Sequence, residues 1–204
     1  MNVPSSSSGI AGGLTIAEIE THAGRAGPHV TGERMVVEAA IQAESSTTLS
    51  AAIKIRPENS PRWTEVPMQF LTGNRWRGEF FITEPGNYVY VIEAWVDHFK
   101  AWRRSLQNEL QAGSHSSRET LLAGVKLIED MVGQAGALDA ERLLGWAQEL
   151  RTGNSATGSP LKDRALDESL AKLMTELAGR QPERQSITTP EKELCVAAIP
   201  KNNL

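Results

Sequence analysis

Cysteine and histidine are scarce in this sequence: 204 residues contain one cysteine, Cys195, and four separated histidines. A single thiol cannot close an intrachain disulfide, and neither a Cys-x-x-Cys nor a His-x-x-x-His spacing occurs. The sequence therefore predicts no local metal site and no other cofactor. We interpret Cys195 as a small apolar residue of a strand.

Long apolar runs and an excess of one charge are also missing. No apolar segment approaches the roughly 20 residues that span a bilayer, and the first 13 residues lack the features of a signal peptide. We therefore expect a cytoplasmic protein with no membrane partner. The 21 basic and 25 acidic residues nearly balance, which does not fit the basic footprint of a nucleic-acid-binding protein. No nucleic-acid partner is expected.

Motifs of catalysis are missing as well. The sequence contains no G-x-S-x-G nucleophile elbow, no phosphate loop and no G-x-G-x-x-G after a strand. Glu93 and Asp97 have the chemistry of the carboxylate pair that glycosidases use. They stand, however, on either side of a predicted strand-to-helix junction. We interpret them as a strand-face residue and a helix cap, and we predict no catalytic residue.

Strand signals are clear between residues 75 and 96. Polar and apolar residues alternate in 75–82, with Trp76 on the apolar face, and again in 87–96, which predicts two half-buried strands. Because Pro85-Gly86 is a favourable turn pair, we expect the two strands to form a hairpin. Tyr88 also fits the corner tyrosine of immunoglobulin-like sandwiches.

The apolar period changes from a strand to a helix directly after Asp97, a residue suited to an N-cap. This direct change would let Trp95 and Trp102 join the strand region to the helical region, as amphipathic rings do at element junctions. The candidate domain-interface residues are Trp95, Asp97, Phe99, Trp102 and Arg103.

The rest of the chain separates into strands and helices. Alternation predicts four more strands, at 14–19, 35–43, 51–56 and 65–70, and Pro67 predicts that the last of these lies on an edge or carries a bulge. Four helices with one apolar face each fit between residue 98 and about residue 179, and residues 194–198 read as a final strand. The pattern leaves open whether the helices are an insertion or a separate domain.

Three motifs in fixed order carry a family resemblance: R-W-x-G-E-F at 75–80, P-G-x-Y-x-Y at 85–90, and I-E-A-W-V-D-x-F-x-x-W-R at 92–103. They resemble the amino-terminal region of the bacterial α-1,4-glucan:maltose-1-phosphate maltosyltransferases. The resemblance implies an α+β fold, an immunoglobulin-like antiparallel β-sandwich interrupted by a four-helix insertion. The implied domains are a disordered tail (1–13), the sandwich (14–97), the helical bundle insertion (98–182), and a returning strand with a truncated C-terminus (183–204).

The resemblance also implies a function. In the family a catalytic barrel that carries the nucleophile and the acid follows this region, and we expect it to begin where this chain stops. The chain would then be a non-catalytic scaffold that forms a homodimer through the helical insertion, while α-glucan and maltose 1-phosphate would bind only the full-length enzyme. The leucine pairs 121–122 and 143–144 also favour a second subunit.

Two alternatives remain open at this stage. The first is a stand-alone α-glucan-binding module, because five tryptophans are many for a chain of this size and an exposed indole can stack on a sugar. The second is a fragment whose gene continues into the barrel.

Overall fold

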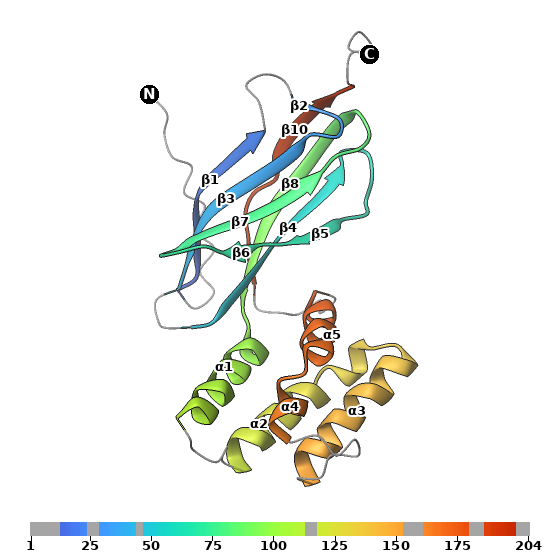
Figure 1. Cartoon of the computed structure of the whole chain (residues 1–204). Coiled ribbons are helices and arrows are strands. Elements are labelled where there is room, and N and C mark those ends of the chain that lie inside the picture. Colours follow the sequence, from blue (N-terminus) through green and yellow to red (C-terminus); the bar gives the residue numbers. More distant parts are fainter. Residues whose placement is uncertain are drawn as a thin grey trace. The chain divides into compact units, whose positions relative to one another are not determined.

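The computed structural model describes residues 13–23, 29–43, 47–112, 118–152, 161–179 and 186–198. In these ranges the fold is α+β, as predicted, with two β-sheets and a set of helices between residues 98 and 178 (Figure 1). The chain separates into two compact units. The strand unit contains residues 13–96 and 186–198, and the helical unit contains residues 97–179. Residues 1–12 of the predicted tail lie outside the described ranges.

The strand unit consists of two sheets. The first has the order β1 (Thr15–Ala23), β3 (Arg34–Gln42), β7 (Arg75–Phe81), β6 (Gln69–Phe70). The second has the order β2 (His29–Val30), β10 (Lys192–Ala197), β8 (Gly86–Val96), β4 (Leu49–Pro57), β5 (Thr64–Pro67), and β9 (Ser186–Thr188) also pairs with β8. Neighbouring strands are antiparallel except β2 and β10, which are parallel.

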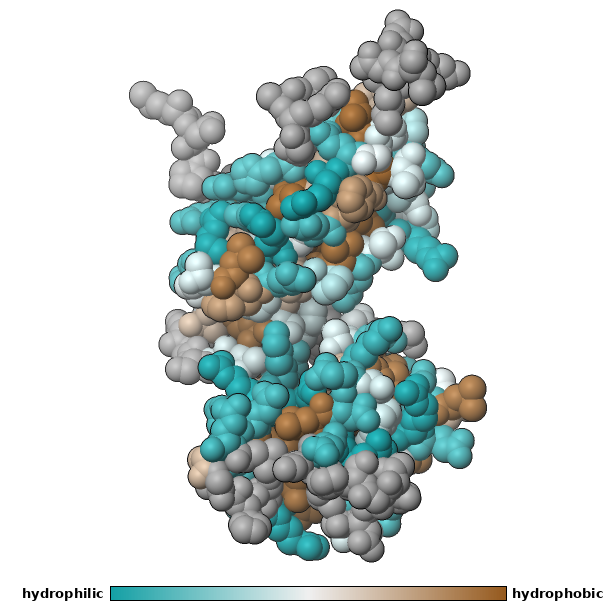
Figure 2. Space-filling model, viewed as in Figure 1, coloured by the Kyte–Doolittle hydropathy of each residue, from teal (hydrophilic) through white to brown (hydrophobic). Residues whose placement is uncertain are grey.

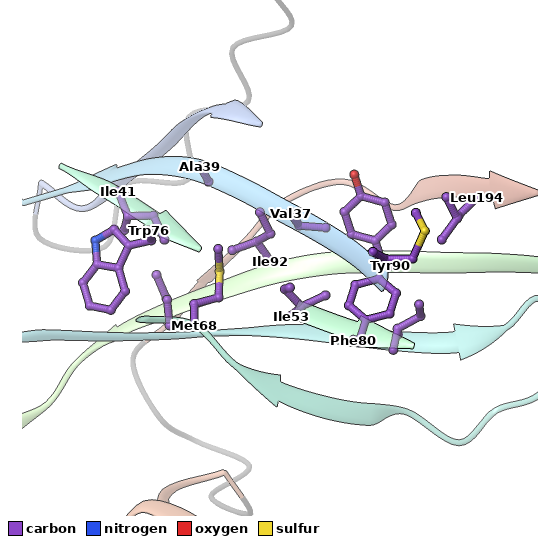
Figure 3. Packing of buried hydrophobic residues seen from close by; sticks show 14 of the residues in the cluster. Val37, Ala39, Ile41, Ile53, Met68, Trp76, Phe80, Tyr90, Ile92 and Leu194 are labelled. Carbon is purple, nitrogen blue, oxygen red and sulfur yellow. The ribbon is translucent and has the colours of Figure 1, made fainter. Parts of the chain in front are cut away.

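One hydrophobic core fills the space between the two sheets. Figure 3 shows side chains from both sheets pointing toward one another, among them Val37 and Trp76 from the first sheet and Ile53 and Ile92 from the second. The half-buried strand predicted for 75–82 is confirmed, because Trp76 is buried in this core and alternates with partly exposed residues. In 87–96 the predicted core face is correct, since Ile92 is buried there, but the strand is not half-buried: Val91 and Trp95 on its other face are buried as well. A Cβ on Gly78 would lie 2.3 Å from Cδ1 of Ile53, so any larger residue there would have to displace the Ile53 side chain.

The predicted hairpin between β7 and β8 is wrong. β7 pairs with β3 and β6, whereas β8 pairs with β4, β9 and β10, so the two strands belong to different sheets. The turn at Pro85-Gly86 carries the chain from one sheet to the other instead of reversing it within a sheet. Tyr88 stabilises this corner, since its hydroxyl donates to the carbonyl oxygen of Glu84 at 3.0 Å.

The edge position predicted from Pro67 is confirmed. Pro67 ends β5, the outermost strand of the second sheet, and the chain then crosses to β6 in the first sheet. The crossing point is Met68, whose amide donates to the carbonyl oxygen of Ala51 at 2.8 Å. Strands β2 and β9 were not predicted, because two or three residues are too few to show an alternating pattern.

The final predicted strand is present as β10, which pairs with β8 in antiparallel register from Lys192 opposite Tyr90 to Val196 opposite Gly86. Residues 97–179 are therefore inserted between two neighbouring strands of one sheet. Strand β9 precedes β10 and pairs with the last residues of β8, with Ser186 opposite Trp95. The points where the chain leaves and re-enters the strand unit are thus adjacent.

The helical unit has its own core, which draws on every helix. The elements are α1 (His98–Gln111), α2 (Arg118–Glu129), the 3-10 helix η1 (Val132–Gln134), α3 (Ala137–Thr152), α4 (Leu161–Ala165) and α5 (Glu168–Ala178). The structure divides the predicted fourth helix into α4 and α5. Asp167 leaves the helical conformation, with φ −54° and ψ 127°, and caps α5 by accepting from the amides of Ser169 and Leu170, so a new helix begins there. None of the described helices is long and apolar enough to cross a membrane.

Candidate functional site

The five candidate interface residues are divided between the two units. Trp95 belongs to the strand unit, where it is buried near the end of β8 and faces away from the core that contains Ile92. Opposite it in register are Ser50 on β4 and Ser186 on β9. The other four residues belong to the helical unit. Their shared role at a domain interface stays a prediction.

Asp97 and Trp102 each have a defined local role. Asp97 caps α1, because its carboxylate accepts from the amide of Lys100 at 2.8 Å, as the sequence predicted. Trp102 is buried in the helical core, and its indole N–H donates to the carbonyl oxygen of Thr120 at 2.6 Å. The ring of Phe99 lies 5.4 Å from the ring of Trp102. A methyl group on Gly124 would lie 2.0 Å from Cζ2 of Trp102, so the indole packs directly on the backbone of α2.

Arg103 connects α1 to the junction between α4 and α5. Its guanidinium donates to the carbonyl oxygen of Leu166 at 2.6 Å and to the carboxylate of Glu168 at 2.9 Å. The Leu166 carbonyl lies where the predicted fourth helix is interrupted. Arg103 therefore stabilises the interruption by supplying a donor to a carbonyl that a continuous helix would have used itself.

The two carboxylates that resemble a glycosidase pair are both used in structural interactions. Glu93 is buried on β8, where it forms an ion pair with Lys54 and accepts a hydrogen bond from the Ser186 hydroxyl at 2.6 Å. Asp97 is the helix cap. Among the described residues, no group of three or more His, Cys, Asp or Glu side chains has an arrangement that could hold a metal ion.

Four of the five tryptophans are buried, namely Trp76, Trp95, Trp102 and Trp146. The guanidinium groups of Arg142 and Arg164 both lie over the ring of Trp146, at 5.4 and 5.5 Å from the ring centre. Trp63 is half-buried, and the guanidinium of Arg56 lies 4.7 Å from its ring centre. Stacking on a sugar needs an open ring face, so these four buried rings do not provide the platforms that a glucan-binding module requires.

Sequence reasoning missed the charge network on the outer face of the first sheet. Glu38 on β3 accepts from Arg77 at 2.7 Å and from Arg75 at 3.2 Å, both on β7. These hydrogen bonds, that from Arg77 first and that from Arg75 second, lower the pKa of the Glu38 carboxyl below its ordinary value. The alternation of charges in β3 and β7 was visible in the sequence, but only the register that places Glu38 opposite Arg77 reveals the pairing.

A second missed contact joins the two sheets. The Tyr90 hydroxyl on β8 lies 2.6 Å from Oγ1 of Thr21 on β1. Burial raises the pKa of Tyr90 above its ordinary value, and the hydrogen bond to Thr21 partly offsets this rise. The two residues are 69 positions apart, so no local sequence signal connects them.

The fold and these contacts define a class of protein module, a two-sheet strand unit with a helical unit inserted between adjacent strands. Comparison with known families gives its identity. The chain belongs to the family described as α-1,4-glucan:maltose-1-phosphate maltosyltransferase, domain N/S, which it matches over residues 21–198.

Individual relatives agree with the family. The chain is 37% identical over 189 residues to an α-1,4-glucan:maltose-1-phosphate maltosyltransferase of Myxococcus xanthus, a match that covers 88% of this chain and 27% of the relative. It is 32% identical over 165 residues to the enzyme of the same name from Chlorobaculum tepidum, covering 81% and 23%. The chain thus spans about a quarter of the length of these relatives.

Proposed function

We propose that the chain is the non-catalytic amino-terminal scaffold of an enzyme that transfers maltosyl units from maltose 1-phosphate to α-1,4-glucan. The observation that carries this proposal is the family match over 21–198 combined with coverage of only 23–27% of two relatives. The carboxylates Glu93 and Asp97 support a structural role, since an ion pair and a helix cap occupy them. The family chemistry would then reside in the remainder of the enzyme.

Strand order supports an immunoglobulin-like sandwich as the finer description of the strand unit. The order β1-β3-β7-β6 corresponds to strands A-B-E-D of that fold, and β10-β8-β4 corresponds to G-F-C. The hydrogen bond from Tyr88 to the backbone four residues upstream is the tyrosine corner expected near the start of strand F. On this interpretation the helical unit occupies the F–G connection.

An activity assay tests the scaffold proposal. The purified chain is incubated with maltose 1-phosphate and a maltooligosaccharide acceptor, and released phosphate is measured, with the Myxococcus xanthus enzyme as positive control. We expect no phosphate from the chain alone. Steady release above a no-protein control would contradict the proposal.

Homodimer formation through the helical unit is the proposed assembly role. Three leucines of this unit are exposed, Leu122, Leu138 and Leu144, the last two on α3. Exposed leucines on packed helices favour burial against another surface. We expect a dimer in sedimentation velocity, and Leu138→Glu with Leu144→Glu should produce a monomer. Ser169→Glu with Thr175→Glu, which adds the same two charges at exposed positions of α5, is the control and should leave the dimer intact.

We also propose that the five candidate residues form the interface between the strand unit and the helical unit. Trp95 is buried at the end of β8, and Asp97, Phe99, Trp102 and Arg103 fix the start of α1. If they form an interface, Trp95→Ala should increase limited proteolysis at residues 95–100 while the protease resistance of β3 stays unchanged. Unaltered cleavage at the junction would reject this role.

For the compartment we propose the cytoplasm, and Cys195 supports this. It is the chain's one cysteine and is exposed on β10, and an exposed free thiol suits a reducing environment.

The α-glucan-binding alternative is tested by affinity electrophoresis in a glycogen gel. The scaffold proposal predicts no retardation relative to a gel without glycogen.

A further inference from the structure

Nine consecutive residues at one edge of the strand unit carry no charge. Residues 66–74, V-P-M-Q-F-L-T-G-N, lie between Glu65 and Arg75 in a chain in which 23% of residues are charged. They include β6, which with β1 is one of the two edge strands of the first sheet. Proteins usually protect such edges with charged side chains or proline. Pro67 does this for β5, but β6 has neither, and we call residues 68–74 the β6 edge.

The β6 edge exposes two large apolar side chains at consecutive positions of the chain. Phe70 is 55% exposed and Leu71 is 43% exposed. Hydrophobic surface is visible over β6 in Figure 2. Neighbouring apolar side chains of this size, unlike a single one, are typical of a surface that another surface covers.

The β6 edge is also held in a fixed conformation. The Leu71 amide donates to the carbonyl oxygen of Arg75 at 2.9 Å, and Phe70 pairs with Trp76 in register. The rings of Phe70 and Trp76 meet edge to face at 5.6 Å, and Trp76 is part of the buried core. Phe70 is therefore ordered before any partner arrives, which lowers the entropy cost of docking.

The strand unit contains a third exposed large apolar residue, Phe81, whose surroundings differ. It lies opposite Arg34 at the end of β7, and Arg34 forms an ion pair with Glu79 on the same strand as Phe81 at 2.8 Å. Charges that are already paired at this position have to be desolvated if a surface docks there. Phe81 is thus a natural control for Phe70 and Leu71, because it is 62% exposed but flanked by charge.

The structure assigns the β6 edge as the docking surface for the remaining three quarters of the polypeptide in the longer relatives. This inference rests on the proposed function. The chain matches 23–27% of two relatives, so most of each relative lies outside the matched region and is available to cover part of its surface. An ordered, uncharged and partly apolar edge is the part of the strand unit best suited to being buried in this way.

Thiol labelling tests the docking surface. In a Cys195→Ser background, Leu71→Cys places one thiol on the β6 edge, and Phe81→Cys is the matched control. Each variant is labelled as the isolated chain and as a chimera in which the chain replaces the matched 27% of the Myxococcus xanthus relative. The same labelling is repeated with the remainder of the relative added as a separate chain.

We expect alkylation of Leu71→Cys to slow at least tenfold in the chimera or the mixture, with Phe81→Cys changed less than twofold. Equal rates for Leu71→Cys with and without the remainder would overturn the inference. A rate that falls with concentration in the isolated chain would also overturn it, because a second copy would then cover the edge. Phosphate release from maltose 1-phosphate by the chimera reports separately on the proposed function.

Discussion

The two units of this molecule are stabilised in different ways. In the strand unit, residues far apart in sequence are in contact both between the sheets, as with Thr21 and Tyr90, and between neighbouring strands of one sheet, as with Glu38 and Arg77. In the helical unit the closest packing is between neighbouring helices, where Trp102 of α1 lies on Gly124 of α2. The comparison shows that the stability of the inserted helical unit depends on packing between helices that follow one another in the sequence. The stability of the strand unit depends instead on the register between strands that are distant in the sequence.

Removing one core tryptophan from each unit tests this separation most strongly. Trp102→Ala and Trp76→Ala each delete a buried indole, and each should cost about 3–5 kcal/mol of stability in its own unit. Hydrogen exchange measured by mass spectrometry distinguishes the units. Trp102→Ala should accelerate exchange in α1 and α2 but not in β3 and β4, and Trp76→Ala should do the reverse. Equal acceleration in both units would show that they unfold as one.

A single added methyl group is expected to have the next largest effect. Gly124→Ala would place Cβ 2.0 Å from Cζ2 of Trp102, and such overpacking costs about 1–3 kcal/mol. Gly145→Ala is the matched control on α3, where nothing lies within 4 Å of the added carbon. Alanine is the better helix former there, so this control should stabilise the helical unit by about 0.5–1 kcal/mol. Thermal unfolding of the two variants should therefore shift in opposite directions.

Tyr90→Phe should destabilise the strand unit by about 1 kcal/mol, because it removes the hydrogen bond between the sheets and leaves the Thr21 hydroxyl without this partner. Urea unfolding of Tyr90→Phe, Thr21→Val and the double variant measures the coupling. Additive losses would show that the bond contributes nothing.

Tyr90 also predicts alkaline sensitivity. Its folded pKa is raised above the ordinary tyrosine value of 10.0, so its contribution to stability is complete below that pH. The contribution is lost as the pH rises from there through the folded pKa, since the unfolded chain releases its proton first. Tyr90→Phe should flatten this part of the stability curve, whereas an unchanged slope would assign the alkaline loss to other groups.

The smallest effect is expected at acid pH. The pKa of Glu38 is lowered in the folded state, so its contribution is complete above the unfolded value of 4.5 and is lost as the pH falls from there through the folded pKa. Glu38→Gln should reduce the acid sensitivity of the strand unit but not that of the helical unit. Glu79→Gln, on the same outer face, is the control. If Glu38→Gln and the parent protein lose stability identically as the pH falls, Glu38 does not contribute to the acid sensitivity of the strand unit.

Periodic patterns were enough to predict most elements. The alternation around Trp76 and Ile92 identified β7, β8 and their buried faces, and Asp97 marked the start of α1. Patterns could not predict how strands pair, since Pro85-Gly86 favours any tight turn and does not specify whether the chain stays in one sheet. The break at Asp167 was hidden for a similar reason: leucines continue at helical spacing through it, and only the cap shows where α5 begins.

The adjacency of β8 and β9 explains how the strand unit can accommodate a long insertion. The first residue of β9, Ser186, is opposite Trp95, so the two ends of the inserted segment are separated by one strand spacing, about 4.8 Å. For the host sheet the whole helical unit is equivalent to a very long hairpin loop, whose closure entropy grows only logarithmically with length. Excising residues 98–184 and joining the ends with a short turn should therefore yield a miniature protein that retains the sheet order of its parent.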